Sequence, residues 1–181
     1  MKLLLASISP RRRQLLAGLC QFEVQPSRFD EAEGGSAEEV VLQNARGKAR
    51  EVFSRFPDCT VLGADTVVAL DGVILGKPKD EEDAKRMLRL LSSRVHSVFT
   101  GVCLIDASGA IERVVETKVL FKTLSENLIE SYVLSGTPMD KAGAYGIQDG
   151  IVVSSYEGSY SNVMGLPVEA VKEMLNLKEC V

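Results

Sequence analysis

Two long segments rich in β-branched residues, 95–105 and 111–121, constrain the fold more than any other feature of this sequence. They are separated by the turn-forming run 106–109. Between Val115 and Lys122, apolar residues and a threonine alternate with charged residues, which is typical of a strand with one buried face. The two segments therefore predict an antiparallel pair of strands.

The other segments predict strands and helices in alternation. Strands are expected at residues 3–6, 22–24, 60–70, 73–75 and 151–156, and helices at 10–18, 36–53, 80–91, 125–134 and 167–177. Helix starts carry capping signals, such as Ser9 before Pro10 and the capping box from Ser36 to Glu39. Because hairpins are interposed in this alternation, the predicted fold class is α/β, with a mixed, partly antiparallel central sheet flanked by helices. With 181 residues and no linker, one domain over residues 1–181 is expected.

The charge distribution points to a small anionic ligand. The net charge is −4, too acidic for a protein that binds nucleic acid through a phosphate-neutralising surface. No acidic residue precedes Glu23, yet Lys2 and Arg11 to Arg13 lie in that stretch. This local positive charge could hold a small anion.

Membrane, secretory and zinc-binding classes are not indicated. No apolar run approaches the roughly 18 residues of a membrane span, and arginines interrupt the short apolar run at the amino end, unlike in a signal peptide. The four cysteines, Cys20, Cys59, Cys103 and Cys180, are far apart and form no C-x-x-C pair. We expect a soluble protein of the cytoplasm, with no nucleic acid or membrane as partner.

The first candidate site follows the first predicted strand, where Ser7 and Ser9 precede a helix that begins Pro10-Arg11-Arg12. Backbone N–H groups, the helix dipole and guanidinium groups all favour an anion at such a place. The alternative is that Ser9 only caps the helix and the arginines are solvated. We expect solvation of Arg13, because three consecutive helical residues cannot point at one target.

A second candidate is Asp65, a carboxylate inside an otherwise apolar strand. A charge there costs several kcal/mol unless it is paired, hydrogen-bonded or bound to a metal. Asp65 could accept turn N–H groups, or it could activate water or bind a hard divalent ion. Lys77 follows the return strand of the same predicted hairpin and adds a cation.

A third candidate is the glycine-rich loop from Asp140 to Gln148. Glycine allows the backbone to approach a ligand closely, and the Gln148 amide offers one donor and one acceptor edge, which suits a nucleobase. Taken alone, this segment is also compatible with a simple turn. His96 is the single histidine, and because no G-x-S-x-G motif accompanies it, we interpret it as structural.

These residues belong to an ordered series of motifs over nearly the whole chain, and the series resembles the Maf family of nucleoside triphosphate pyrophosphatases. The matching motifs are Ala6-Ser7-x-Ser9-Pro10-Arg11-Arg12, Asp30-Glu31, Asn44-Ala45-x-x-Lys48-Ala49, Gly63 to Val68, Gly76-Lys77-Pro78, His96-Ser97-Val98-x-Thr100-Gly101, Asp140 to Gln148, and Tyr160-x-Asn162-Val163-x-Gly165-Leu166-Pro167. The resemblance implies an inosine-triphosphatase-like (Maf/Ham) fold.

The resemblance also implies a reaction, the hydrolysis of a nucleoside triphosphate between its α and β phosphates. Asp65 matches the proton acceptor, and Arg11, Thr66 and Gln148 match positions that set substrate choice. The form of the loop that ends at Gln148 is similar to the subgroup that acts on dTTP and UTP. The residues expected to bind the phosphates are Ser7, Ser9, Arg12, Lys48, Lys77 and Lys141.

The resemblance implies a divalent cation, Mg²⁺ or Mn²⁺, which we expect Glu31 and Asp65 to carry, and it makes a homodimer plausible. Two other functions stay open. One is a nucleotide-binding regulator of cell division, in which hydrolysis is incidental, since the family has been linked to inhibition of septum formation. The other is the removal of modified pyrimidine nucleotides.

Overall fold

The computed structural model describes residues 2–179, so Cys180 lies outside the described residues. The strands are β1 (Leu3–Leu5), β2 (Glu23–Val24), β3 (Thr60–Leu70), β4 (Val73–Leu75), β5 (Val95–Asp106), β6 (Gly109–Phe121) and β7 (Val153–Glu157). The helices are α1 (Pro10–Ala17), α2 (Ala37–Arg55), α3 (Glu81–Leu91), α4 (Glu126–Leu134), α5 (Tyr160–Val163) and α6 (Val168–Glu179). Three 3₁₀ turns, η1 (Thr137–Asp140), η2 (Ala142–Ala144) and η3 (Ile147–Asp149), form the glycine-rich loop.

Within the described residues, seven strands form one mixed sheet in the order β2-β1-β3-β5-β6-β7, and β4 also pairs with β3. β1 runs parallel to β2 and β3, whereas the other pairs are antiparallel. The predicted α/β class with a mixed sheet is confirmed, as is the pairing of β5 with β6. None of the helices described is long and apolar enough to cross a membrane.

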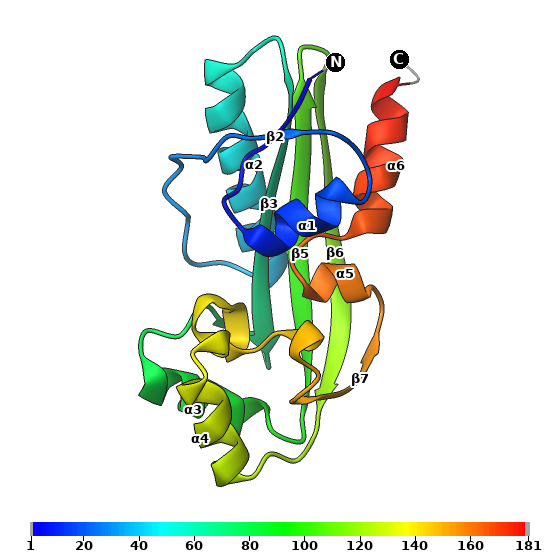
Figure 1. Ribbon diagram of the computed structural model, residues 1–181. Helices are drawn as coiled ribbons and strands as arrows, with labels where there is room; N and C mark the ends of the chain where they lie inside the picture. Colours follow the sequence, from blue (N-terminus) through cyan, green and yellow to red (C-terminus); the bar gives the residue numbers. More distant parts are fainter. Residues whose placement is uncertain (1, 180–181) are drawn as a thin grey trace.

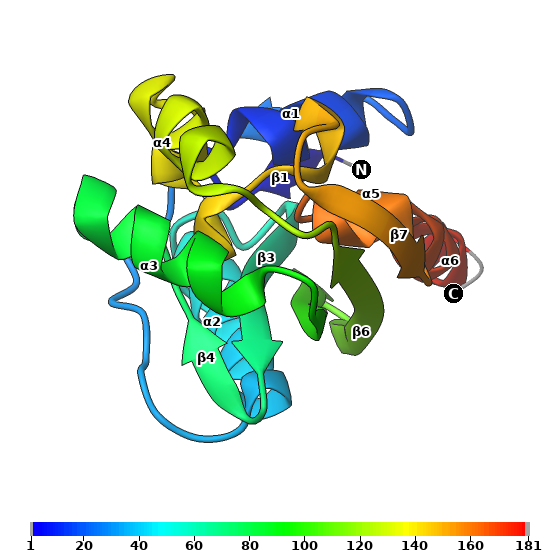
Figure 2. The same ribbon diagram turned by 90° about the horizontal axis from the view of Figure 1, so that it is seen from below.

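Helices cover both faces of the sheet (Figures 1 and 2). On one face, α2 packs through Ala45, Ala49 and Val52 against the sheet. On the other face, α1 and α6 pack at one end of the long strands, and α3 and α4 pack at the other end. The side chains of β3 alternate between these faces, so neighbouring residues of β3 contact different helices.

Two glycines allow α2 to lie unusually close to the sheet. A Cβ atom at Gly63 would lie 2.2 Å from the carbonyl oxygen of Ala45, and one at Gly101 would lie 2.3 Å from that of Val41. Gly101 is the β5 partner of Asp65. Because no side chain separates helix from sheet here, Asn44 and Lys48 of α2 can reach Asp65.

The edge of β3 away from β5 contains a break in strand pairing. β1 pairs with residues 60–62 and β4 with residues 68–70, which leaves residues 63–67 without a partner strand on that side. Asp65 and Thr66 lie in this break, in the middle of β3, on opposite faces of the sheet. Side chains from both faces can therefore reach one space at this edge.

Candidate active site

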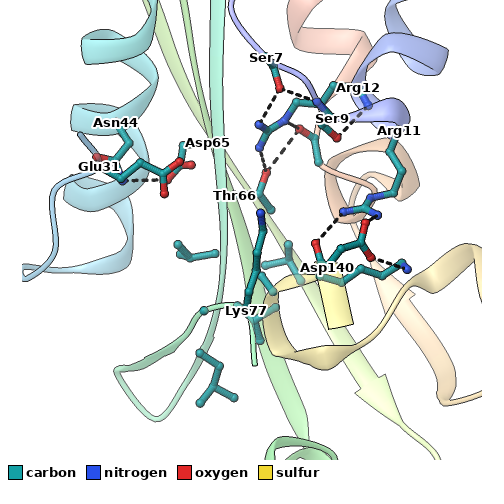
Figure 3. A pocket seen from close by; sticks show the side chains of 18 of the residues that line it. Ser7, Ser9, Arg11, Arg12, Glu31, Asn44, Asp65, Thr66, Lys77 and Asp140 are labelled. Atoms are coloured by element: carbon teal, nitrogen blue, oxygen red, sulfur yellow. Dashed lines mark hydrogen bonds and ion pairs between the residues drawn. The ribbon is translucent and has the colours of Figure 1, made fainter. Parts of the chain in front are cut away.

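The break in the edge of β3 opens into a cavity of about 1090 Å³ (Figure 3). All of the site residues predicted from the sequence line this cavity: Ser7, Ser9, Arg11, Arg12, Glu31, Lys48, Asp65, Thr66, Lys77, Lys141 and Gln148. They come from segments far apart in the sequence. Their convergence is what the structure adds to the motifs, and the chemical role of each residue stays a prediction.

On the α2 face of the sheet, two side chains of α2 bind Asp65. This aspartate is buried, with only 7% of its surface exposed. The ammonium group of Lys48 lies 2.7 Å from Oδ1 of Asp65, and Nδ2 of Asn44 donates to Oδ2 at 3.1 Å. Lys48 and Asn44 are one helical turn apart, so they share one face of α2. The buried carboxylate is thus compensated at both oxygens.

Lys48 also joins Asp65 to Glu31. Its ammonium group lies 2.6 Å from Oε1 of Glu31, so two carboxylates converge on one cation. Burial raises the pKa of Glu31, but the hydrogen bond and the charge of Lys48, with smaller contributions from Lys77 and Arg12, outweigh it and lower the pKa below its ordinary value. Glu31 is therefore ionised at neutral pH.

On the other face of the sheet, Arg12 connects the amino end to β3. Its guanidinium donates to the carbonyl oxygen of Gly165 at 2.8 Å, to Oγ1 of Thr66 at 3.1 Å and to Oγ of Ser7 at 3.4 Å. Desolvation lowers the pKa of Arg12, although Asp65 and Glu31 favour its charged form. Oγ of Ser9 accepts from the backbone N–H of Arg12, so Ser9 caps α1 as predicted.

Asp140 holds two of the predicted ligand-binding cations at the cavity. Nη1 of Arg11 donates to Oδ2 of Asp140 at 3.0 Å, and the ammonium group of Lys141 donates to Oδ1 at 3.0 Å and to the carbonyl oxygen of Thr137. Burial raises the pKa of Asp140, but the bonds from Lys141 and Arg11 outweigh it and lower the pKa. An anion therefore already occupies part of the donor set of both cations.

The 3₁₀ turns bring the glycine-rich loop to the end of β4. The backbone N–H of Gly143 donates to the carbonyl oxygen of Gly76 at 3.0 Å, which sets the loop beside Lys77. Gln148, in η3, is exposed and lines the cavity. Arg13 is exposed and is not among the residues that line the cavity, as expected of a solvated side chain.

His96 contacts this loop through Tyr145 but is not among the residues that line the cavity. Its Nε2 lies 2.8 Å from the hydroxyl of Tyr145, and both rings pack edge-on against Phe121. Burial lowers the pKa of His96 to about 4 and raises the pKa of Tyr145, so the pair is neutral at neutral pH. The structural interpretation of His96 agrees with this position.

Glu31 and Asp65 also fit the donor set of a hard divalent cation. In the described part of the chain no group of three or more His, Cys, Asp or Glu side chains gathers as a metal site. Mg²⁺, however, usually binds through one or two carboxylates and completes its shell with water and substrate phosphates. In this structure the two carboxylates share the ammonium of Lys48, and their assignment to a metal stays a prediction.

Two residues of this site carry contacts that no prediction assigned to them. Asn44 was part of a motif without a role, although its spacing of four residues from Lys48 on a predicted helix places both on one face. Asp140 began the glycine-rich loop, and no local signal pairs it with Arg11, which lies 129 residues away.

Comparison with known proteins shows the family of this chain. A family model described as Maf-like protein matches residues 2–178. The dTTP/UTP pyrophosphatase of Thermococcus gammatolerans is 49% identical over 178 residues, covering 97% of this chain and 96% of that protein. Those of Pyrococcus abyssi and Moorella thermoacetica are 48% and 46% identical, covering 97% and 96% of this chain and 95% and 93% of their own lengths. The resemblance read from the motifs is confirmed, and this chain belongs to the Maf family.

Proposed function

We propose that this protein hydrolyses dTTP and UTP to the nucleoside monophosphate and pyrophosphate. The observation that carries this proposal is the cavity at the break in β3, where a buried carboxylate from one face of the sheet meets cations from the other. The relatives named dTTP/UTP pyrophosphatase, which match nearly the whole chain, support the choice of substrate.

The charge of the cavity suits a triphosphate. Among the described residues, seven basic and five acidic side chains line it, in a protein whose net charge is −4. One cation about 4 Å from a phosphate contributes about 1 kcal/mol in water and about 4 kcal/mol at an intermediate dielectric, so several must converge. Donors come from the start of α1, the end of β4 and the glycine-rich loop: Ser7, Ser9, Arg12, Lys77 and Lys141.

Lys48 can serve both the carboxylates and the substrate. An ammonium group has three N–H donors, and Glu31 and Asp65 occupy two of them. The third remains for a phosphate oxygen. Lys48 then places a phosphate next to Asp65, which is where the attacking water must be activated.

In the reaction, Asp65 accepts a proton from a water molecule while the water oxygen forms a bond to the α phosphorus. The bond from the α phosphorus to the oxygen that bridges it to the β phosphorus breaks, and pyrophosphate leaves with that electron pair. Each carboxylate oxygen has more than one lone pair, so Asp65 can accept this proton while Lys48 and Asn44 hold its orientation. Cations around the phosphates stabilise the charge that moves onto the leaving group.

Glu31 and Asp65 are the residues that would hold a divalent cation, Mg²⁺ or Mn²⁺. When bound, such an ion polarises phosphoryl oxygens and neutralises their charge. The proposed role of Glu31 is thus to supply the second carboxylate ligand of this ion, beside Asp65.

Base selection is assigned to Gln148, with Arg11 and Thr66. Thymine and uracil present an imide N–H between two carbonyl groups, and the Gln148 amide offers a matching acceptor and donor. Arg11 has guanidinium donors beyond those bound to Asp140. Thr66 is bound to Arg12 and Thr100, so it shapes the wall between the phosphate donors and β5.

The deciding experiment incubates the purified protein with a panel of ribo- and deoxyribonucleoside triphosphates, including modified pyrimidines, and Mg²⁺ or Mn²⁺. We expect equal amounts of monophosphate and pyrophosphate, with dTTP and UTP preferred. Orthophosphate as the sole phosphate product, or no turnover of any nucleotide, would refute the proposal. The homodimer and the cytoplasmic location stay predictions, which light scattering and cell fractionation can test.

A further inference from the structure

The segment that carries Glu31 runs along one side of α2, with contacts about one helical turn apart. Nη2 of Arg55 donates to the carbonyl oxygen of Pro26 at 2.9 Å, and Oε2 of Glu51 accepts from the backbone N–H of Arg28 at 2.9 Å. Further along, Phe29 lies against Gly47, Glu31 binds Lys48, and Ala32 binds Asn44. The chain from Pro26 to Ala32 is therefore laid antiparallel to α2, which acts as its template.

Asn44 is the contact nearest to the reacting groups. Its side chain accepts from the backbone N–H of Ala32 at 2.7 Å and donates to the carbonyl oxygen of Ala32 at 3.3 Å. The same Nδ2 atom donates to Asp65 at 3.1 Å. The residue is only 2% exposed, so these bonds are shielded from competing water. One amide thus links Asp65 to the backbone next to Glu31.

Gly47 fixes the segment on the other side of Glu31. A Cβ atom at Gly47 would lie 2.3 Å from the ring of Phe29, a distance that no real contact allows. The ring therefore occupies the space that a side chain at position 47 would need. Phe29 and Ala32 bracket Glu31, so two separate contacts with α2 determine where its carboxylate lies.

We propose that Asn44 is a positioning residue, which together with Gly47 holds the segment 26–32 in register with β3 so that Glu31 and Asp65 converge. This inference rests on the proposed function, because it concerns the same reaction. Neither residue contacts the phosphates in this scheme. Their effect is on the geometry of the two carboxylates, where a displacement of about 1 Å can lower the rate by roughly a hundredfold.

Gly47→Ala is the sharpest variant, because it changes neither carboxylate and leaves all of the phosphate donors in place. The new methyl group expels the ring of Phe29. Alanine is favoured over glycine in a helix interior, which offsets part of the packing lost with the ring of Phe29. Asn44→Ala removes the other contact, and Gln43→Ala, at an exposed neighbouring position of α2, is the matched control.

The variants are compared in pyrophosphate release from dTTP, in melting temperature, and in the hydrogen exchange of the Ala32 amide followed by NMR. For Gly47→Ala and Asn44→Ala we expect kcat to fall at least roughly tenfold, while KM for dTTP stays within about twofold, because the phosphate donors are untouched. The Ala32 amide should exchange faster in both variants, and the melting temperature of Gly47→Ala should change little, because the gain in helix propensity offsets the lost contact of Phe29. Gln43→Ala should match the unmodified protein in every measurement.

Wild-type kcat in Gly47→Ala, or unchanged exchange of its Ala32 amide, would overturn the inference. A loss expressed only in KM would also overturn it, because it would place these residues in substrate binding. Exchange does not depend on turnover, so it tests the register of the segment even if the unmodified protein releases no pyrophosphate. That last result would instead refute the proposed function.

Discussion

Replacing Lys48 with methionine tests whether the two carboxylates depend on this cation for stability. Lys48→Met retains most of the apolar stem and removes the charge. In the folded protein Lys48 is 8% exposed and lies 2.7 Å from Asp65, which is 7% exposed. The second partner, Glu31, has a side chain that is 59% exposed, so water can solvate it. The destabilisation should therefore come mainly from Asp65.

The expected loss in the free energy of unfolding follows from the burial of Lys48 and Asp65. Removing one partner of a buried ion pair costs about 3–5 kcal/mol, because the other charge stays buried without a counter-charge, whereas an exposed pair contributes about 0–1 kcal/mol. In Lys48→Met, Asp65 keeps only the neutral hydrogen bond from Asn44. In a protein of this size, 1 kcal/mol corresponds to about 2–4 °C in Tm. We expect Lys48→Met to unfold with a free energy lower by about 3–5 kcal/mol and a Tm lower by roughly 6–20 °C.

The assay is urea unfolding near neutral pH, with the double variant Lys48→Met/Asp65→Asn as the control. An amide at position 65 needs no counter-charge, so the double variant should regain at least about 2 kcal/mol relative to Lys48→Met, within the range of coupling between contacting residues. If Lys48→Met unfolds within about 1 kcal/mol of the unmodified protein, or if Asp65→Asn brings no recovery, then the pair does not contribute as the burial indicates.

Three further predictions concern single side chains. Asp65→Asn should lower kcat for pyrophosphate release by about 10²–10⁴-fold with little change in Tm, because Lys48 keeps Glu31 as a partner; retained turnover would exclude Asp65 as the base. Gln148→Glu should weaken the preference for dTTP and UTP, measured as kcat/KM ratios over the nucleotide panel, because a carboxylate cannot donate to the base; an unchanged profile would contradict base reading by Gln148. The folded-state pKa of His96, about 4, lies below its ordinary 6.5, because the ring is buried. Between these pH values the folded state binds fewer protons than the unfolded state. The free energy of unfolding should therefore rise with pH in this window, by up to roughly 3 kcal/mol. This rise should be smaller in His96→Phe than in the unmodified protein, measured by urea unfolding at several pH values in that window; equal slopes would show that other groups cause it.

Much of the fold could be predicted from the sequence because its signals are local. The bounds predicted for β3 and β4 are those observed, and the caps at Ser9, Ser36 and Asp80 all form. Alternation, turn residues and capping residues act within a few positions of each other. The carboxyl-terminal part was less regular, because β7 is an edge strand with a register shift opposite Leu120 and Phe121, and it begins two residues later than predicted. The helix α5 formed between the elements predicted at residues 151–156 and 167–177, where neither helix nor strand was expected.

The residues that line the cavity could also be predicted from the sequence, since every predicted site residue is among them. The contacts that these residues make could not be predicted. Lys48 was expected to bind phosphate, and the structure gives it two carboxylate partners. Arg12 was expected at the phosphates, and its guanidinium reaches the carbonyl oxygen of Gly165. Such pairings depend on how α1, α2 and the loop before α6 pack on the sheet, which no local pattern records.

The sequence by itself therefore determined the kinds of chemistry in this protein: an acid-free amino end suited to an anion, and a carboxylate in an apolar strand that required compensation. Only the tertiary structure decided that these meet. Asp65 and Thr66 point to opposite faces of the sheet, and they line one cavity because strand pairing is broken along residues 63–67 of β3. A break in pairing is a property of three strands at once. It arises from where β1 ends and β4 begins against β3, and neither end is marked at Asp65 itself.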